Sequence, residues 1–179
     1  EITHIIRGEE HLSNTPKQIL IQQALNFRAL KYAHIPLILN PDRTKMSKRY
    51  LEFSVSDYRA NGYLPETLLN FLVLLGWHPK DDKEVFGLEE MIKEFEIKRV
   101  QKAGAIFNIE KLDWLNAQRI RKMPVSEIAV LLEPYLKEKS ISAPREFVEK
   151  IIEAERERVK TIKDFIEIAD FFFKLPDYG

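Results

Sequence analysis

The chain has 179 residues, of which 28 are basic, 28 acidic and 45% hydrophobic. This composition is typical of a folded globular protein and not of a disordered one. Because the net charge is zero, RNA binding would require a local cluster of Lys and Arg. The absence of cysteine excludes disulfides and thiol catalysis. No apolar run approaches the roughly 20 residues that span a bilayer. We therefore expect a cytoplasmic protein with no membrane segment.

The first predicted element is a strand. Ile2 to Ile6 alternates and is rich in β-branched residues, and the Arg7-Gly8 pair after it is typical of a turn. A helix is expected to begin at Thr15, because Thr15 followed by Pro16 suits an N-cap and a first helical residue. Gln18 stands three residues after Thr15, where it would complete a capping box.

A second short strand is predicted at Ile35 to Leu39, where an apolar run is interrupted by proline. The order strand, helix, strand favours a parallel pair of strands. Ligands of such sheets bind beyond the carboxyl ends of the strands. Two segments occupy these ends, Arg7 to His11 and Asn40 to Arg49, and they are the candidates for a functional site.

The rest of the chain has mainly helical spacing, which predicts a mixed α/β fold that is mainly helical. The helix that ends at Gly76 is expected to be well buried, and Trp77 and Trp114 are expected in the core and not as platforms for base stacking. The predicted helices are Leu64–Gly76, Gly87–Phe95, Ile97–Ala103, Ile109–Ile120, Val125–Leu136 and a longer helix from Pro144 with helical spacing up to Phe172.

The segment Asn40 to Arg49 holds four cations within seven positions, and only Asp42 could neutralise any of them locally. Lysines are compact and movable charges, and Ser47 adds a hydroxyl donor. Such a set could hold a triphosphate while negative charge moves onto the departing pyrophosphate. Composition alone favours a solvated basic loop, so the surrounding motifs decide the interpretation.

Lys45-Met46-Ser47-Lys48-Arg49 resembles the second signature of class I aminoacyl-tRNA synthetases, the KMSKS motif. Arg7-Gly8-Glu9-Glu10-His11 resembles the glutamyl subgroup of that family and disfavours the glutaminyl branch. Arg43 stands where the family commonly has glycine. The likeness continues in order along nearly the whole chain, with further matches at Asn40–Asp42, Gly62–Glu66, Leu74–Trp77 and Leu112–Asn116.

The resemblance implies a ligase that activates glutamate with ATP to an enzyme-bound adenylate and then transfers it to tRNA(Glu). Arg7 would bind the glutamate. Lys45, Ser47 and Lys48 would act in catalysis by holding the phosphates, and Lys48 is the strongest candidate. Mg²⁺ would accompany ATP, and we predict no metal held by protein side chains, because the four histidines share no ligand-like spacing. The implied ATP-binding set is Glu10, His11, Leu37, Ile38, Lys45, Met46, Ser47 and Lys48.

The helical middle of the chain resembles the stem-contact region of the family. Cations around the Leu112 to Leu115 pattern could contact tRNA phosphates, although helix solubility would explain them equally well. The tRNA-binding residues implied by the resemblance are Lys102, Lys111, Asn116, Arg119 and Arg121, with Lys122 beside them.

The resemblance also implies an organisation for the chain, which we expect to be a monomer. A remnant of a Rossmann-like parallel sheet would be followed by an α-helical stem-contact region and a helical bundle. The expected domains are 1–60, the later part of the catalytic domain; 61–135, the stem-contact region; and 136–179, the start of the anticodon-binding domain.

The family's first signature, a His-Ile-Gly-His-like element, is not among these 179 residues, and neither is the first half of the nucleotide-binding sheet. We therefore expect a piece of an enzyme of the glutamyl subgroup that lacks the amino-terminal catalytic half and is inactive alone. The chief alternative is a non-catalytic RNA-binding module derived from a synthetase. A tRNA-modifying relative is disfavoured, because such relatives lack the helical extension after Glu133.

Overall fold

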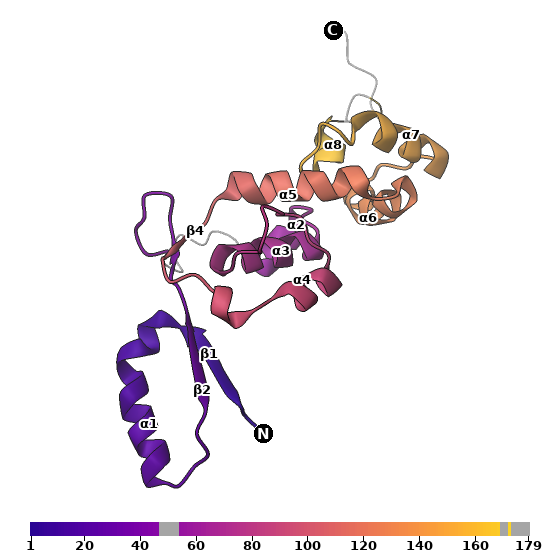
Figure 1. Ribbon diagram of the computed structural model, residues 1–179. Helices are drawn as coiled ribbons and strands as arrows, with labels where there is room; N and C mark the ends of the chain where they lie inside the picture. Colours follow the sequence, from indigo (N-terminus) through magenta and orange to yellow (C-terminus); the bar gives the residue numbers. More distant parts are fainter. Residues whose placement is uncertain (47–53, 169–171, 173–179) are drawn as a thin grey trace. The chain divides into compact units, whose positions relative to one another are not determined.

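The computed structural model describes residues 1–46, 54–168 and 172 (Figure 1). The chain forms two compact units. The first unit comprises Glu1–Leu51 and Leu72–Asn108, and the second comprises Glu52–Phe71 and Ile109–Gly179. The fold is mixed α/β and mainly helical, as predicted. None of the helices in the described residues has the length and apolar character needed to cross a membrane.

The first unit contains a parallel pair of strands, β1 (His4–Gly8) and β2 (Lys31–Ile35). A 3-10 turn, η1 (Glu9–Asn14), and the helix α1 (Thr15–Ala24) connect them. Figure 1 shows α1 running beside the two strands. A parallel pair joined through a helix is present as predicted, but its second strand is Lys31–Ile35 and not the predicted Ile35–Leu39.

Two details at the start of the chain differ from the prediction. The strand is His4–Gly8 and not Ile2–Ile6, so Arg7 and Gly8 lie within the strand and not in a turn after it. The capping box at Thr15 is wrong, because Thr15 is the first residue of α1 and Asn14 takes the N-cap position without a side-chain bond. The Thr15 hydroxyl instead donates to the His11 carbonyl oxygen at 3.0 Å, within the preceding turn.

The strand predicted at Ile35 to Leu39 is wrong as the partner of β1, because the chain is interrupted at Pro36. β2 ends at Ile35, and β3 (Ile38–Leu39) follows and pairs in parallel with β4 (Ala105–Ile106). Proline has no amide hydrogen for a ladder bond, so the division falls at that residue.

The other helices of the first unit surround a small aromatic core. The helix predicted at Gly87–Phe95 is confirmed as α4 (Leu88–Glu94), but the one predicted at Ile97–Ala103 is only a 3-10 turn, η2 (Ile97–Arg99), before β4. The core cluster consists of Trp77, Phe86 and Met91. Trp77 is therefore in the core, as predicted.

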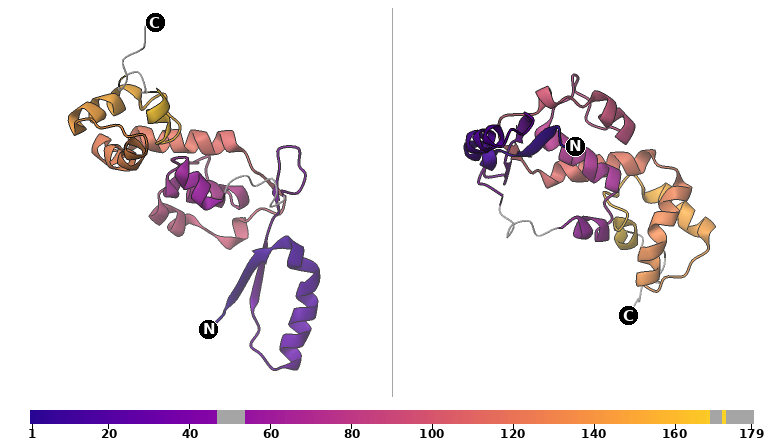
Figure 2. Two further views of the ribbon diagram at one scale, coloured as in Figure 1. Left: turned by 180° about the vertical axis from the view of Figure 1, so that it is seen from behind. Right: turned by 90° about the horizontal axis from the view of Figure 1, so that it is seen from below.

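The second unit is helical (Figure 2). Its helices are α2 (Val55–Ala60), the start of α3 (Pro65–Gly76), α5 (Ile109–Lys122), α6 (Val125–Glu138), α7 (Arg145–Glu155) and α8 (Asp164–Ile168). Its core combines residues from α5 to α8 with Leu64, and it includes the fully buried side chains Ile120, Ile128, Ile152 and Phe165. The helices predicted at Leu64–Gly76, Ile109–Ile120 and Val125–Leu136 are confirmed.

The long helix predicted from Pro144 is two helices. α7 ends at Glu155, and Val159 and Ile162 are buried in the connection that follows, so apolar spacing continues where the helix does not. Thr161 and Asp164 cap the start of α8 reciprocally, because the Asp164 carboxylate accepts from the Thr161 amide at 2.9 Å and the Thr161 hydroxyl accepts from the Asp164 amide at 3.3 Å.

The burial expected for α3 is incomplete, since Leu69 and Leu72 are 40% and 44% exposed.

Two adjacent leucines on α6 test where the core of the second unit lies. Leu132 is 1% exposed, and Leu131 is 39% exposed. We expect Leu132→Ala to lower the free energy of unfolding by about 2–5 kcal/mol, because it removes buried methyl groups and leaves a cavity. Leu131→Ala is the matched control and should cost clearly less. Urea unfolding of both variants measures the difference, and equal losses would contradict this packing.

Candidate functional site

The carboxyl ends of β1 and β2 bring three polar side chains together in the first unit. Arg7 and His34 are register partners in the parallel pair, so their side chains stand on the same sheet face. Tyr32 lies on that face too, with its ring centroid 5.5 Å from the Arg7 guanidinium carbon. Gln22 of α1 donates to the Tyr32 hydroxyl at 2.7 Å, which places α1 over this face.

Thr15, at the start of α1, completes this cluster. The Arg7 Nη2 atom donates to the Thr15 hydroxyl at 2.8 Å, and the His34 Nε2 atom lies 3.1 Å from the same oxygen. A longer contact of 3.5 Å joins Arg7 Nε and His34 Nε2. Thr15 is 8% exposed, so its hydroxyl is held in place by packing as well as by hydrogen bonds.

Arg7 has no carboxylate partner among residues 1–46, 54–168 and 172, although its side chain is only partly exposed. A partly buried guanidinium without a counter-charge is costly unless an anion reaches it. Guanidinium groups bind carboxylates through two parallel hydrogen bonds. The geometry therefore suits a carboxylate ligand at the predicted glutamate-binding residue.

The acidic residues after β1 have separate positions. The Glu9 carboxylate accepts from the backbone amide of Leu37 at 3.3 Å, which ties the end of β1 to the segment after β2. Glu10 and His11 are both about half exposed and lie 4.0 Å apart. Gly8 leaves room for Glu10, because a Cβ atom on Gly8 would lie 2.1 Å from its carboxylate.

The basic segment begins in a hairpin that follows β3. The Asn40 amide donates to the Thr44 carbonyl oxygen at 2.9 Å, and the Met46 amide donates to the Ile38 carbonyl oxygen at 3.0 Å. Lys45 bridges to Leu39 in antiparallel fashion. The hairpin therefore places Lys45 and Met46 directly beside β3. Ser47 and Lys48, two of the predicted catalytic residues, lie outside the described residues.

The turn of the hairpin is built around Asp42. Its carboxylate accepts from the Thr44 hydroxyl at 2.6 Å and from the Thr44 amide at 2.9 Å. These two hydrogen bonds, the hydroxyl one first, lower the pKa of Asp42 below its ordinary value. Arg43 has a φ of 65°, a left-handed conformation that glycine adopts more easily. This conformation is consistent with the glycine that class I aminoacyl-tRNA synthetases commonly have at this position.

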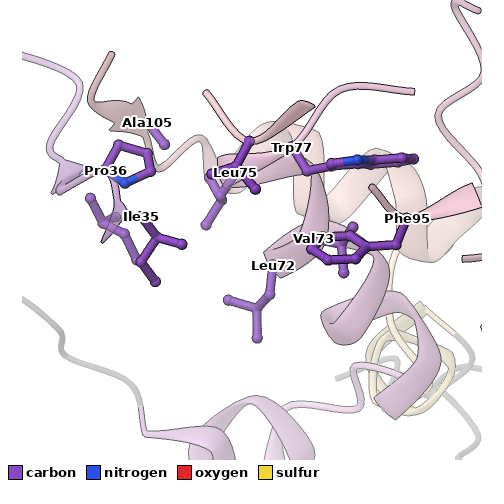
Figure 3. A pocket seen from close by; sticks show the side chains of 11 residues that line it. Ile35, Pro36, Leu72, Val73, Leu75, Trp77, Phe95 and Ala105 are labelled. Carbon is purple, nitrogen blue, oxygen red and sulfur yellow. The ribbon is translucent and has the colours of Figure 1, made fainter. Parts of the chain in front are cut away.

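The two predicted adenine-pocket residues occupy different surroundings. Ile38 lines an apolar cavity of about 170 Å³ in the first unit, together with residues of α3 and Trp77. Figure 3 shows Ile35, Pro36 and Ala105 at one end of this cavity and Trp77 and Phe95 at the other. Leu37 is not part of this lining, and its backbone binds Glu9 and the Ala105 amide. Consecutive residues of an extended segment point to opposite faces. One ligand could therefore meet the side chain of only one of the two residues.

The predicted tRNA-binding cations belong to different parts of the structure. Lys102 is exposed in the first unit. Lys111, Arg119 and Arg121 lie on α5 in the second unit, where Leu112 and Leu115 are buried beneath them as the pattern predicts.

Contacts are described for Lys111, Trp114 and Arg121 on α5. Lys111 holds its ammonium group 4.4 Å from the centroid of the Trp114 ring, and Trp114 is 42% exposed, so the prediction that it lies in the core is wrong. Arg121 is engaged with Glu157, at 3.1 Å between Nε and the carboxylate.

Asn116 is a buried connector. It has no exposed surface, its amide oxygen accepts from the Leu64 backbone at 3.0 Å, and its amide nitrogen donates to the Lys160 carbonyl oxygen at 2.6 Å. A direct contact between this side chain and tRNA is incompatible with that burial. Asn116 instead joins three segments of the second unit.

Comparison with known proteins identifies the family. The family model of tRNA synthetases class I (E and Q), catalytic domain, matches residues 1–114. The glutamate–tRNA ligase of Carboxydothermus hydrogenoformans is 47% identical over 179 residues, which cover 97% of this chain. The chain belongs to the glutamyl-tRNA synthetase family. Glutamate–tRNA ligase 2 of Caldanaerobacter subterraneus is 54% identical over 137 residues, covering 76% of the chain and 28% of that relative.

Solved structures of the same family share the fold. A glutamate tRNA ligase from Elizabethkingia meningosepticum, solved in complex with its amino acid, has a TM-score of 0.90 and 36% identity, and the match covers 98% of this chain and 39% of that one. The chain likewise spans 37% of the length of the Carboxydothermus glutamyl-tRNA synthetase. These relatives are therefore much longer than the 179-residue chain.

Three residues of the cluster around Arg7 are not among the predicted site residues: Thr15, Tyr32 and His34. His34 lies outside the strand predicted at Ile35 to Leu39, because the observed strand β2 runs from Lys31 to Ile35 and pairs His34 with Arg7. The pattern around Thr15 indicates only a helix cap. Its contact with Arg7 depends on how η1 returns the chain over the sheet, and no local pattern encodes that path.

The Asp42 turn generates a test by pH and mutation. We expect Thr44→Val to raise the pKa of Asp42 toward its ordinary value, because the variant removes the largest cause of the lowering. The stabilisation of the turn by ionised Asp42 is present above the unfolded-state pKa, and it is lost as pH falls through the lowered folded-state pKa. A carbon-detected NMR titration of the carboxyl groups measures the pKa of Asp42 in the wild-type protein and in Thr44→Val.

Asp57 provides the internal control for this titration. Its pKa is lowered by a hydrogen bond from the Ser54 side chain, and it should not respond to the change at Thr44. An unchanged Asp42 pKa in Thr44→Val, or an equal shift at both carboxyl groups, would contradict the described turn.

Proposed function

We propose that this chain is part of a full-length glutamate–tRNA ligase that attaches glutamate to tRNA(Glu) through a glutamyl-adenylate. Its family membership and its 37% span of a longer Carboxydothermus relative support this proposal. The observation that carries this proposal is the environment of the Arg7 side chain. A partly buried guanidinium at the strand ends, with no carboxylate partner among the described residues, suits the carboxylate of an amino-acid substrate.

Glutamate would meet Arg7 at the carboxyl ends of β1 and β2. Arginine is suited to this role because its planar fork matches the two oxygens of a carboxylate. The amino acid bound in the related Elizabethkingia structure supports a substrate of this kind. Glu10 and His11, exposed beside the same strand end, would meet the nucleoside of ATP.

The polyphosphate of ATP would meet the basic segment that begins in the hairpin. Lys45 stands at its start, and Met46 is held to β3 by the bond to Ile38. Ser47 and Lys48 follow directly in sequence. Lysine ammonium groups are movable point charges, so they can follow charge as it moves to pyrophosphate, and no covalent role is required of them. ATP would bring Mg²⁺ with its phosphates, and one of the two adjacent residues Leu37 and Ile38 would contribute its side chain to the adenine site.

The second unit would contact tRNA through the exposed side of α5. Lys111 over the Trp114 ring offers a cation and an aromatic surface together, and Arg119 and Arg121 follow along the helix. Arg121 would exchange its Glu157 partner for a phosphate. Lys102 would contribute from the first unit. Such contacts would position tRNA without reading its sequence.

The phosphate-binding role of Lys48 is tested in the full-length protein that includes these residues. We expect Lys48→Ala to lower kcat for ATP–pyrophosphate exchange about 100-fold, because one charge that stabilises the transition state is lost. Lys31→Ala is the matched control, since Lys31 is exposed at the opposite end of β2 and should leave exchange unchanged. Normal exchange in Lys48→Ala would contradict the role.

The same assay separates the ligase from an RNA-binding module. A full-length protein that binds tRNA but shows no glutamate-dependent exchange, with tRNA(Glu) present in the assay, would be a module and not a ligase. The 179-residue chain assayed alone should show negligible exchange, because it lacks the first signature of the family.

A further inference from the structure

We propose that Thr15 and His34 are positioning residues that orient Arg7 for the carboxylate of the amino-acid substrate. This inference rests on the proposed function, because it assumes that Arg7 binds that carboxylate. Thr15 lies on α1 and His34 on β2, both in the first unit. Each side chain contacts the Arg7 guanidinium group, and the two side chains also contact each other. The substrate would not touch either of them.

The hydrogen bonds at the Thr15 hydroxyl define the arrangement of protons. A threonine hydroxyl has one hydrogen to donate and two lone pairs that accept. It accepts from Arg7 Nη2 at 2.8 Å, and its hydrogen lies within reach of the His11 carbonyl oxygen at 3.0 Å and of His34 Nε2 at 3.1 Å. His34 Nε2 accepts from Arg7 Nε at 3.5 Å, so this nitrogen carries no hydrogen. Thr15 and His34 therefore both present acceptors to the Arg7 guanidinium group.

This arrangement uses one side of the Arg7 guanidinium and leaves the other open. Nε and Nη2 form one edge of the planar group, and this edge faces Thr15 Oγ1 at 2.8 Å and His34 Nε2 at 3.5 Å. The end formed by Nη1 and the second hydrogen of Nη2 has no partner that the structure gives within the described residues. Two parallel hydrogens at that end match a bidentate carboxylate.

The Tyr32 ring limits the remaining freedom of the guanidinium. Its centroid lies 5.5 Å from the guanidinium carbon, and Gln22 holds its hydroxyl at 2.7 Å. Arg7 is thus constrained along one edge by Thr15 and His34 and against one face by Tyr32. A substrate that meets a side chain already held in its binding conformation loses less free energy to ordering.

Thr15 is not needed as a helix cap, which separates its proposed role from a structural one. Asn14 occupies the N-cap position of α1, and the Thr15 hydroxyl makes no cap bond. The His11 carbonyl oxygen alone would satisfy the hydrogen of a threonine that is 8% exposed. A lone pair of the hydroxyl accepts from Arg7.

The test measures steady-state ATP–pyrophosphate exchange by the full-length protein in the presence of tRNA(Glu), with glutamate and ATP varied separately. We expect Thr15→Val, which keeps the shape and removes the hydroxyl, to raise KM for glutamate about 10-fold, as expected for losing a hydrogen bond to a charged group. KM for ATP and the melting temperature should stay close to wild type. Thr15→Ser restores the hydroxyl and should restore KM for glutamate.

Two further variants keep the test decisive. Thr3→Val is the matched control, because Thr3 is an exposed threonine before β1 whose side chain contacts only His4 in the structure described. His34→Leu should also raise KM for glutamate, and in the double variant with Thr15→Val the increase should be smaller than the product of the two single effects, since both act on Arg7. His34→Gln, which keeps an acceptor, should show a smaller increase than His34→Leu.

The outcomes separate this proposal from the proposed function. A wild-type protein without glutamate-dependent exchange would overturn the ligase assignment and the positioning role with it. An active wild type with an unchanged KM for glutamate in Thr15→Val would overturn the positioning role alone. Equal increases in both KM values, or a failure of Thr15→Ser to restore KM for glutamate, would assign Thr15 a merely structural role.

Discussion

The parallel pairing of β1 with β2 is the constraint on which the chemistry of the first unit depends. The register places Arg7 beside His34, and the connection through η1 and α1 returns Thr15 to the same sheet face. A shift of one residue would turn Arg7 to the opposite face. The register of the strand pair therefore determines which side chains meet around Arg7.

The first unit carries two kinds of positive charge, Arg7 in β1 and Lys45 in the hairpin after β3, and their geometries differ. Arg7 is held on one edge and against an aromatic face, as suits recognition of a planar carboxylate. Lys45 lies in a hairpin whose backbone is fixed to β3, and lysine carries its charge at the end of a long and flexible side chain. In the proposed reaction, Arg7 would hold the amino acid in a fixed orientation while movable lysine charges follow the phosphates.

The sequence predicts elements better than it predicts contacts. Strand, helix and strand before residue 40 indicate the parallel pair, and Gly76 marks the end of α3, because these features depend on local spacing and on glycine. Motif likeness finds Arg7 and the lysine segment. The reciprocal cap of Thr161 and Asp164 was also readable as a Thr-x-x-Asp pattern, which would have divided the long helix predicted from Pro144.

The remaining differences come from contacts between residues far apart in the chain. Asn116 looks like a surface polar residue of a basic helix, but its amide joins Leu64 to Lys160 in a fully buried position. Trp114 looks like a core residue but is 42% exposed under Lys111. Burial in both cases depends on which face of α5 meets the other helices, and the local sequence is compatible with either face.

In the proposed site, Arg7 presents its Nη1 and Nη2 end to a substrate carboxylate while Thr15 holds the adjacent edge formed by Nε and Nη2. A crystal structure of the full-length protein with glutamate bound tests it most directly. The account predicts both carboxylate oxygens on Nη1 and Nη2, with Thr15 Oγ1 still within hydrogen-bond distance of Nη2. A glutamate bound away from Arg7, or an Arg7 side chain that leaves Thr15 to reach it, would contradict the account.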